Sequence, residues 1–210
     1  MITTAIIGAG GFGLEVATIL TELSSYKIMG YIDNRKRKGD EINGIPLIGG
    51  DDTLEGLTDK VEAVVVAIAD CKTRKFLMGK IKELGFQQPT LVHPRSYISK
   101  DVVIGEGSIV YPGAVIMSGC VLAEGVLINS MASLGHEVNI KSFSNINPGV
   151  NIAGRVIIGE CSFLGIGSTI LESCAIGDKV IVGAGAVVLG DVPSGVTVIG
   201  VPAKKLDKKI

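Results

Sequence analysis

The chain has 210 residues, nearly balanced charges (20 Lys and Arg against 21 Asp and Glu) and only 4% aromatic residues. This balance gives no electrostatic reason to bind nucleic acid or an anionic membrane. No apolar stretch reaches the ~20 residues that cross a bilayer, and the start lacks the basic segment of a signal peptide, so we expect a cytoplasmic protein. Four separated cysteines without CxxC spacing indicate reduced thiols rather than a metal ribbon or a redox pair.

Residues 1–90 have the pattern of an α/β domain. An apolar strand at residues 3–8 runs into a glycine loop at residues 8–13, whose N–H groups suit a phosphate at the start of a helix. The further elements expected are a helix at 14–23, strands at 28–33, 45–48 and 61–69, a solvated loop at 35–43 and a helix at 73–84. Asp33, at the end of the second strand, would hold a ribose in a dinucleotide fold. Because only one mononucleotide half fits before residue 91, we predict a half-Rossmann domain that binds one nucleotide with its attached sugar.

The rest of the chain, residues 91–210, is a second expected domain with a C-terminal tail, and a six-residue period runs through it unbroken from about residue 97 to 192. From Ile98 to Val188 every sixth residue is aliphatic, and four positions after each stands a small residue or Val. This period fits neither a helix nor an isolated strand and is typical of a β-solenoid whose triangular coil takes three hexads. Residues 18 apart should then stack at the ~4.8 Å spacing of paired strands. We predict about five uninterrupted coils, with Cys120 and Cys174 as packing residues in the small position.

Eight short motifs occur along the whole chain, at residues 8–13, 31–34, 67–69, 92–94, 127–129, 135–137, 152–154 and 198–203. Together with the hexads they resemble the sialic acid O-acetyltransferase and bacillosamine-pathway sugar N-acetyltransferase family. This resemblance implies that the β-helix is parallel and left-handed. It also implies acetyl transfer from acetyl-coenzyme A without a metal, and a homotrimer with active sites between subunits.

The resemblance assigns roles to particular residues. His136 matches the histidine that deprotonates the attacking group, and Glu137 the acid that orients it. Gly154, which the 18-residue rule stacks beside His136, matches a glycine whose N–H meets the thioester carbonyl. The other expected acetyl-coenzyme A contacts are Asn145, Asn147, Gly165, Ile166, Ala184 and Lys204. The expected acceptor contacts are Gly8, Gly10, Gly11, Phe12, Asp33, Asn34, Ala69 and Asn129.

The two histidines of the chain differ in their setting. His136 lies two positions after Leu134, at a corner or outward site, and imidazole titrates near neutral pH, which suits a general base. His93 precedes a proline at the domain junction, and we interpret it as structural. Phe12 and Asn145 stand where some relatives have histidines, so the resemblance leaves the acceptor open.

Alternatives remain at this point. The first choice of acceptor is the amine of a UDP-4-amino-4,6-dideoxysugar, and the second is a sialic acid hydroxyl. A γ-type carbonic anhydrase needs three histidines for zinc, which two histidines supply only by pooling subunits. An NAD-dependent oxidoreductase is disfavoured by the size of the first domain, and a noncatalytic nucleotide-sugar-binding protein is a further alternative.

Overall fold

The computed structural model describes residues 1–36 and 38–206. Position 37 of the expected surface loop, and residues 207–210 of the expected tail, lie outside the described residues. The chain divides into two compact units, Met1–Leu91 and Val92–Ile210.

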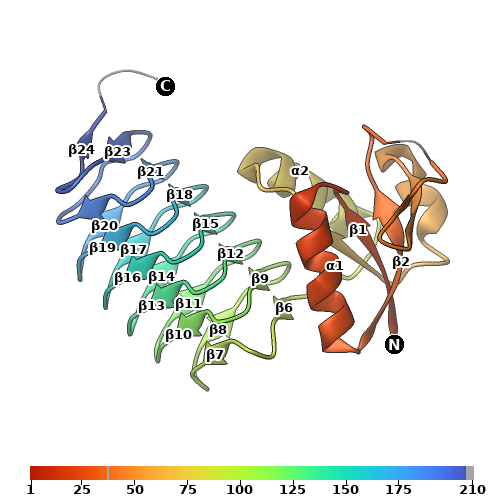
Figure 1. Cartoon of the computed structure of the whole chain (residues 1–210), viewed down its shortest axis with the longest axis horizontal. Coiled ribbons are helices and arrows are strands. Elements are labelled where there is room, and N and C mark those ends of the chain that lie inside the picture. The colour runs from red at the N-terminus through yellow and green to blue at the C-terminus, as the bar shows by residue number, and fades with distance from the viewer. Residues whose placement is uncertain (37, 207–210) are drawn as a thin grey trace. The chain divides into compact units, whose positions relative to one another are not determined.

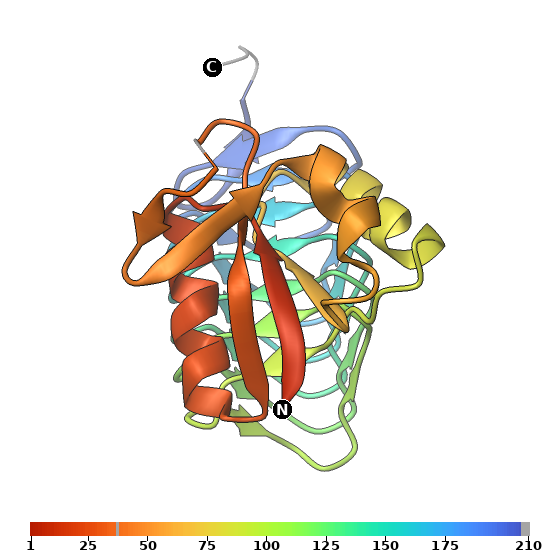
Figure 2. The same ribbon diagram turned by 90° about the vertical axis from the view of Figure 1, so that its right-hand side faces the viewer.

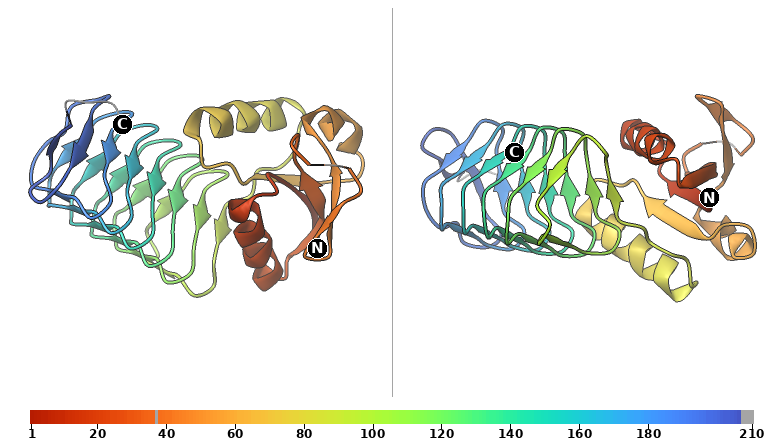
Figure 3. Two further views of the ribbon diagram at one scale, coloured as in Figure 1. Left: turned by 45° about the horizontal axis from the view of Figure 1, so that its top comes forward. Right: turned by 90° about the horizontal axis from the view of Figure 1, so that it is seen from below.

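The first unit is a five-stranded sheet in the order β3-β4-β2-β1-β5, with α1 and α2 on opposite faces (Figure 3). Its elements are β1 (Ile2–Ile7), α1 (Gly11–Leu23), β2 (Tyr26–Ile32), β3 (Glu41–Ile42), β4 (Ile45–Gly49), the 3-10 helix η1 (Asp51–Leu57), β5 (Ala63–Val66) and α2 (Cys71–Glu83). Helix α1 packs beside β1 and β2 (Figure 2). Strand β1 pairs in parallel with β2 and β5, and β2 pairs in parallel with β4. The carboxyl ends of these four strands therefore share one edge, and the change of winding direction at β1 creates a crevice there.

Several expected boundaries in this unit were wrong. Helix α1 begins at Gly11 because Gly10, in extended conformation, caps it. Strand β5 ends at Val66 because the carbonyls of the next residues turn to the buried guanidinium of Arg74, whose Nη1 donates to the carbonyls of Ile68 (2.8 Å) and Ala69 (2.9 Å). The expected loop at 35–43 contains β3, which pairs antiparallel with β4, and η1 was not predicted.

The second unit is a parallel β-helix of stacked triangular coils (Figure 1). After β6 (Leu91–Val92), its two-residue strands follow at six-residue intervals: β7 (Tyr97–Ile98), β8 (Val103–Ile104), β9 (Ile109–Val110), β10 (Val115–Ile116), β11 (Val121–Leu122), β12 (Leu127–Ile128), β13 (Ser133–Leu134), β14 (Asn139–Ile140), β15 (Asn145–Ile146), β16 (Asn151–Ile152), β17 (Ile157–Ile158), β18 (Phe163–Leu164), β19 (Thr169–Ile170), β20 (Ala175–Ile176), β21 (Ile181–Val182) and β22 (Val187–Val188). Strand β23 (Thr197–Ile199) continues one face, and β24 (Lys204–Lys205) pairs with it antiparallel.

The coils stack in the predicted register. Leu127 pairs with Asn145 and Val115 with Ser133, each 18 residues apart. The aliphatic hexad residues from Val110 to Val188 form the buried core. The hexapeptide pattern therefore predicted strands β7 to β22, the stacking rule and the core, whereas β6, β23 and β24 lie outside the predicted hexads.

Two of the buried serines that occupy the small-residue position of the hexad, Ser162 and Ser168, differ in their hydrogen bonding. The hydroxyl of Ser162 donates to the Gly177 carbonyl at 2.8 Å and accepts the N–H of Val180 at 3.1 Å. Ser168, one hexad later, is equally buried, and its hydroxyl has no hydrogen-bond partner among the described residues. Comparing the two serines therefore isolates the effect of hydrogen bonding, because the two side chains are equally buried.

We therefore expect Ser162→Ala to lower the free energy of unfolding by about 1–3 kcal/mol, because it leaves a buried N–H and a partly buried carbonyl without their partner. Ser168→Ala should leave stability unchanged or raise it, because it removes a buried hydroxyl that has no partner. Urea unfolding of both variants measures the difference. Equal losses in the two variants would contradict the assignment.

Candidate active site

His136 and Glu137 form a hydrogen-bonded pair at the corner that follows β13. The imidazole Nδ1 lies 2.9 Å from Glu137 Oε2, and the two side chains are 52% and 61% exposed. Glu137 has a left-handed φ of 60°, with which the chain turns at this corner. When the carboxylate accepts a hydrogen bond from Nδ1–H, the proton of the neutral ring stays on Nδ1, and Nε2 is left as the basic nitrogen. The prediction that His136 lies at an outward corner is confirmed.

Gly154 lies beside His136, one coil further on, as predicted. The N–H of Arg155 donates to the His136 carbonyl at 2.8 Å and joins the two coils. A Cβ on Gly154 would stand 2.5 Å from His136 Nε2, so only glycine leaves room for the ring. The N–H of Gly154 makes no hydrogen bond to any described residue. Pro112 and Pro148, which have no N–H, occupy the same hexad position in other hexads. The hydrogen bonds between coils therefore do not require an N–H at this position.

Three other side chains of the second unit that could react, those of His93, Cys120 and Cys174, are buried. His93 is 2% exposed, and its Nδ1 accepts the N–H of Arg95 at 3.0 Å, in agreement with a structural role. Burial raises the pKa of the Cys120 and Cys174 thiols. His136 is therefore the histidine that a substrate can reach from solvent.

Most of the residues expected to bind acetyl-coenzyme A lie at a different corner of the prism. His136 follows a strand of the sheet that contains β10, β13 and β16, whereas these residues follow strands of the sheet that contains β12, β15, β18 and β21. The residues at this second corner are Asn147, Gly165, Ile166 and Ala184, with Asn129 one coil earlier. Asn145 is 8% exposed on β15 itself, and Lys204 is exposed on β24. A single chain does not gather these residues around His136.

The expected stack of Asn129, Asn147 and Gly165 is present, since Ile128 pairs with Ile146 and Ile146 with Leu164. The two asparagine amides bind the main chain. Asn129 Oδ1 accepts the N–H of Ser130 at 2.7 Å, and Asn147 Nδ2 donates to the Leu164 carbonyl at 2.6 Å. These contacts fix both side chains at the corner.

A cavity of ≈ 340 Å³ opens at the carboxyl ends of the parallel strands in the first unit. Three of the residues predicted for the acceptor line it, namely Gly8, Asp33 and Asn34. Gly8 has a φ of 102°, and a Cβ there would lie 2.7 Å from the Ala67 carbonyl oxygen, so this position requires glycine. The cavity is therefore where the topology predicts a ligand.

Asp33 ties the glycine loop to the end of β2. Its Oδ2 accepts the N–H of Ala9 and its Oδ1 the N–H of Arg35, each at 2.9 Å. Burial by itself would raise the pKa of Asp33, but the two N–H donors and the charges of Arg35 and Lys36 outweigh it and hold the pKa below its usual value. The ionised carboxylate thus holds the loop in place, in addition to any contact with a ribose.

Sequence reasoning missed several lining residues and included some that do not line this cavity. Arg35, Asp51 and Thr73 line it and were not predicted. Asn34 and Asp51 are paired twice, from Asn34 Nδ2 to Asp51 Oδ2 and from Asp51 N to Asn34 Oδ1, both at 2.8 Å. The position of Asp51 soon after a parallel strand was the signal that could have found it. The predicted acceptor residues outside the lining are Gly10, Gly11, Phe12 and Ala69 in the first unit and Asn129 in the second.

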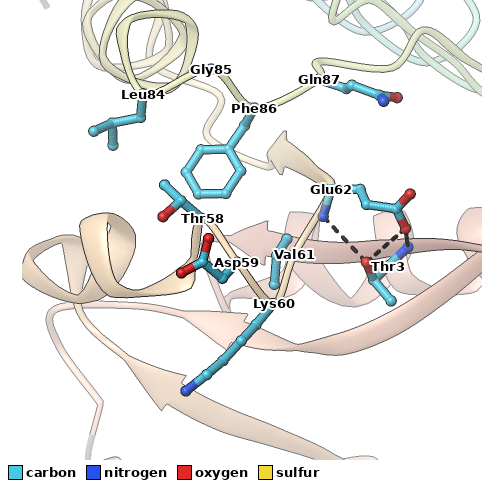
Figure 4. Close-up of a pocket in the computed structure, with 10 residues that line it drawn as sticks. All are labelled: Thr3, Thr58, Asp59, Lys60, Val61, Glu62, Leu84, Gly85, Phe86 and Gln87. Carbon is cyan, nitrogen blue, oxygen red and sulfur yellow. Dashed lines mark hydrogen bonds between the residues drawn. The ribbon is translucent and has the colours of Figure 1, made fainter.

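A second hollow, of ≈ 320 Å³, lies at the opposite edge of the same sheet (Figure 4). Thr3 and Glu62 face each other there, with the N–H and the hydroxyl of Thr3 both donating to Glu62 Oε2 at 2.8 Å. These hydrogen bonds lower the pKa of Glu62. None of the predicted site residues lines this hollow.

Comparison with known proteins agrees with this division of the chain. The family described as PglD N-terminal domain matches residues 4–81, and bacterial transferase hexapeptide (six repeats) matches residues 155–190. The acetyltransferase domain of PglB from Neisseria gonorrhoeae, solved alone and with acetyl coenzyme A, is 36% identical. Without ligand it covers 98% of this chain and 100% of its own, with a TM-score of 0.93. The chain belongs to the hexapeptide-repeat sugar acetyltransferase family.

A second solved member of this hexapeptide-repeat sugar acetyltransferase family is perosamine N-acetyltransferase from Caulobacter crescentus, in complex with CoA and GDP-perosamine. It is 31% identical, with a TM-score of 0.95, and the match covers 98% of this chain and 97% of that one. The putative lipopolysaccharide biosynthesis O-acetyl transferase WbbJ of Escherichia coli is 39% identical over 69 residues, 32% of this chain. The matched segments span only 25% to 35% of the curated relatives' own lengths.

The described part of the chain has neither a membrane-spanning helix nor a cluster of metal ligands. None of its helices combines the length and apolarity needed to cross a bilayer. It contains no group of three or more His, Cys, Asp or Glu side chains arranged to hold a metal ion.

Gly154→Ala should keep the fold and displace the His136 ring, because the new methyl group would overlap the imidazole. Nitrogen-15 NMR of His136 should then report loss of the Nδ1 contact to Glu137. Gly190→Ala is the matched control, since Gly190 lies two coils further in the same column and has no atom within 4 Å of an added Cβ. An unchanged His136 signal in Gly154→Ala would contradict the proposed crowding.

Asp33 should make stability depend on pH in the acid range. Its folded pKa lies below the unfolded value of ~3.9, so its contribution is complete above that value and is lost as pH falls through the folded pKa. Urea unfolding of wild type and Asp33→Asn between neutral and strongly acid pH measures this. The difference between the two proteins should shrink toward low pH, and a constant difference would refute the linkage.

Proposed function

We propose that the chain transfers an acetyl group from acetyl-coenzyme A to the amine of a nucleotide-linked amino sugar, with a UDP-4-amino-4,6-dideoxysugar as first choice. One observation carries the proposal: His136 is held at Nδ1 by Glu137, and its Nε2 lies on the side of Gly154 where a Cβ would stand, next to a residue whose N–H has no partner among the described residues. The PglB domain with acetyl coenzyme A and the perosamine enzyme with GDP-perosamine support the two substrate classes.

The proposed chemistry uses these three residues in sequence. The sugar amine attacks the thioester carbonyl while His136 Nε2 takes a proton from the amine nitrogen. Glu137 stabilises the resulting imidazolium, and the Gly154 N–H donates to the oxygen of the tetrahedral intermediate. Collapse of that intermediate breaks the carbon–sulfur bond, and the imidazolium returns its proton to the leaving thiolate.

The two substrates are assigned to different parts of the chain. We assign the nucleotide of the acceptor to the cavity at Gly8, Asp33 and Asn34, with Gly10, Gly11, Phe12, Ala69 and Asn129 as further acceptor contacts. The N–H groups at the start of α1 are suited to its phosphates. Acetyl-coenzyme A is assigned to Gly154, Asn145, Asn147, Gly165, Ile166, Ala184 and Lys204.

The separation of the two corners supports a homotrimer. His136 and the Asn147 corner are apart in one chain, and a neighbouring subunit would supply the second corner to each site. Acetyl-coenzyme A and nucleotide sugars are metabolites of the cytoplasm, where we place the reaction.

A second acceptor class is a sugar hydroxyl, with sialic acid as the example. The match to WbbJ, named as an O-acetyl transferase, favours it. A hydroxyl is a weaker nucleophile than a neutral amine and depends more strongly on His136.

The test is coenzyme A release in the presence of UDP- and GDP-linked amino sugars and of free sialic acid. Wild type should be active with an amino-sugar nucleotide, and His136→Asn should lose about 10²- to 10⁴-fold in kcat with an unchanged melting temperature. Activity with sialic acid alone would establish the hydroxyl acceptor instead. Full activity of His136→Asn would remove this residue from the mechanism.

A further inference from the structure

The corner that carries His136 also carries an ion pair that the proposed mechanism does not use. Glu137, Arg155 and Ser173 follow one another at 18-residue spacing, so each lies one coil from the next. Main-chain bonds fix this order: Arg155 N donates to the His136 carbonyl at 2.8 Å, and Ser173 N to the Gly154 carbonyl at 2.9 Å. Arg155 therefore stands between Glu137 and Ser173.

The side chain of Arg155 has two carboxylates within reach, one on each side. At present it points away from Glu137: its Nη2 donates to Glu172 Oε1 at 2.7 Å, and its Nε lies 3.4 Å from Ser173 Oγ. Both members of the pair are at least half exposed, at 50% and 60%, so the contact is an exchangeable surface ion pair. Neighbouring coils are only ~4.8 Å apart, which an arginine side chain spans easily in either direction.

Two further acids in the same column are already bound to the main chain. Asp101 Oδ2 accepts the hydroxyl of Ser118 and the N–H of Gly119, at 2.6 and 2.9 Å. Asp191 Oδ1 accepts the N–H of Ala175 at 2.8 Å. An arginine released from Glu172 would therefore find its next partner in the carboxylate of Glu137, to which guanidinium binds with a two-pronged geometry.

We propose that Glu172 is a positioning residue: by holding the guanidinium of Arg155, it leaves the carboxylate of Glu137 to the Nδ1 of His136. The catalytic importance of this arrangement rests on the function proposed above, whereas the arrangement itself does not. Loss of Glu172 lets Arg155 compete for Glu137, the imidazole loses its acceptor, and the proton on the neutral ring redistributes from Nδ1 to Nε2. The ring then no longer presents Nε2 as a base.

Nitrogen-15 NMR of the two histidines at alkaline pH, where imidazole in general is neutral, tests this without an activity assay. Wild type should show His136 mainly as the Nδ1–H tautomer, and Glu172→Gln should shift it toward Nε2–H. The double variant Glu172→Gln/Arg155→Met should return it to the wild-type state, because the competitor is gone. His93, buried and bound to the Arg95 N–H, is the internal reference.

The kinetic counterpart uses the same variants and a matched control. Glu172→Gln should lower kcat about three- to five-fold with little change in KM, and the double variant should recover it. Glu124→Gln, an exposed acid at the same hexad position on another corner, should have no effect. An unchanged tautomer in Glu172→Gln, or a double variant that is not rescued, would overturn the positioning role. An inactive wild type with the expected tautomer shift would refute the proposed function and leave the positioning role intact.

Discussion

Each coil of the second unit is held to the next by main-chain hydrogen bonds that reach 17 residues along the chain. The N–H of Val121 donates to Val138, that of Leu127 to Ser144 and that of Asn139 to Val156. Three hexads close one turn with no residue to spare, so a single insertion would break this ladder and move the aliphatic side chains off the inner face. The hydrophobic core, the corners and the main-chain position of each outward residue follow from this one register.

The same register brings the reactive groups together. His136, Gly154 and Glu172 lie in one column because they are 18 residues apart, and Glu137 and Arg155 lie in the next. Loops that carry a site must each be ordered separately, whereas here the stacked coils fix the main-chain positions of His136, Gly154 and Arg155. The cost is that one corner offers little room, which is why a glycine must stand beside the imidazole.

Much of the second unit could be predicted from the sequence because every hexad forms the same structure, a short strand with one aliphatic residue inside and a small residue at the bend. Knowing the phase at Ile98 was enough to place Leu134 inside and His136 outside. The first unit was harder, since its boundaries depend on contacts distant in sequence: the end of β5 depends on Arg74, which is buried and binds the carbonyls of Ile68 and Ala69. The spacing of residues in the sequence also could not predict that Asp51 lines the cavity, which depends on packing. Nor could it predict that the Arg155 side chain points to Glu172, which depends on its rotamer.

The short strand β24 reverses direction against β23 at the end of the described β-helix. A stack of parallel coils has the geometry of a growing fibril: its last turn offers unpaired N–H and carbonyl groups to any further strand. On this face the reversed strand uses those groups itself, with Lys204 and Lys205 as its two residues, and charged edges resist edge-to-edge pairing. On this face, therefore, the described β-helix closes its own strand edge against the addition of a further parallel strand.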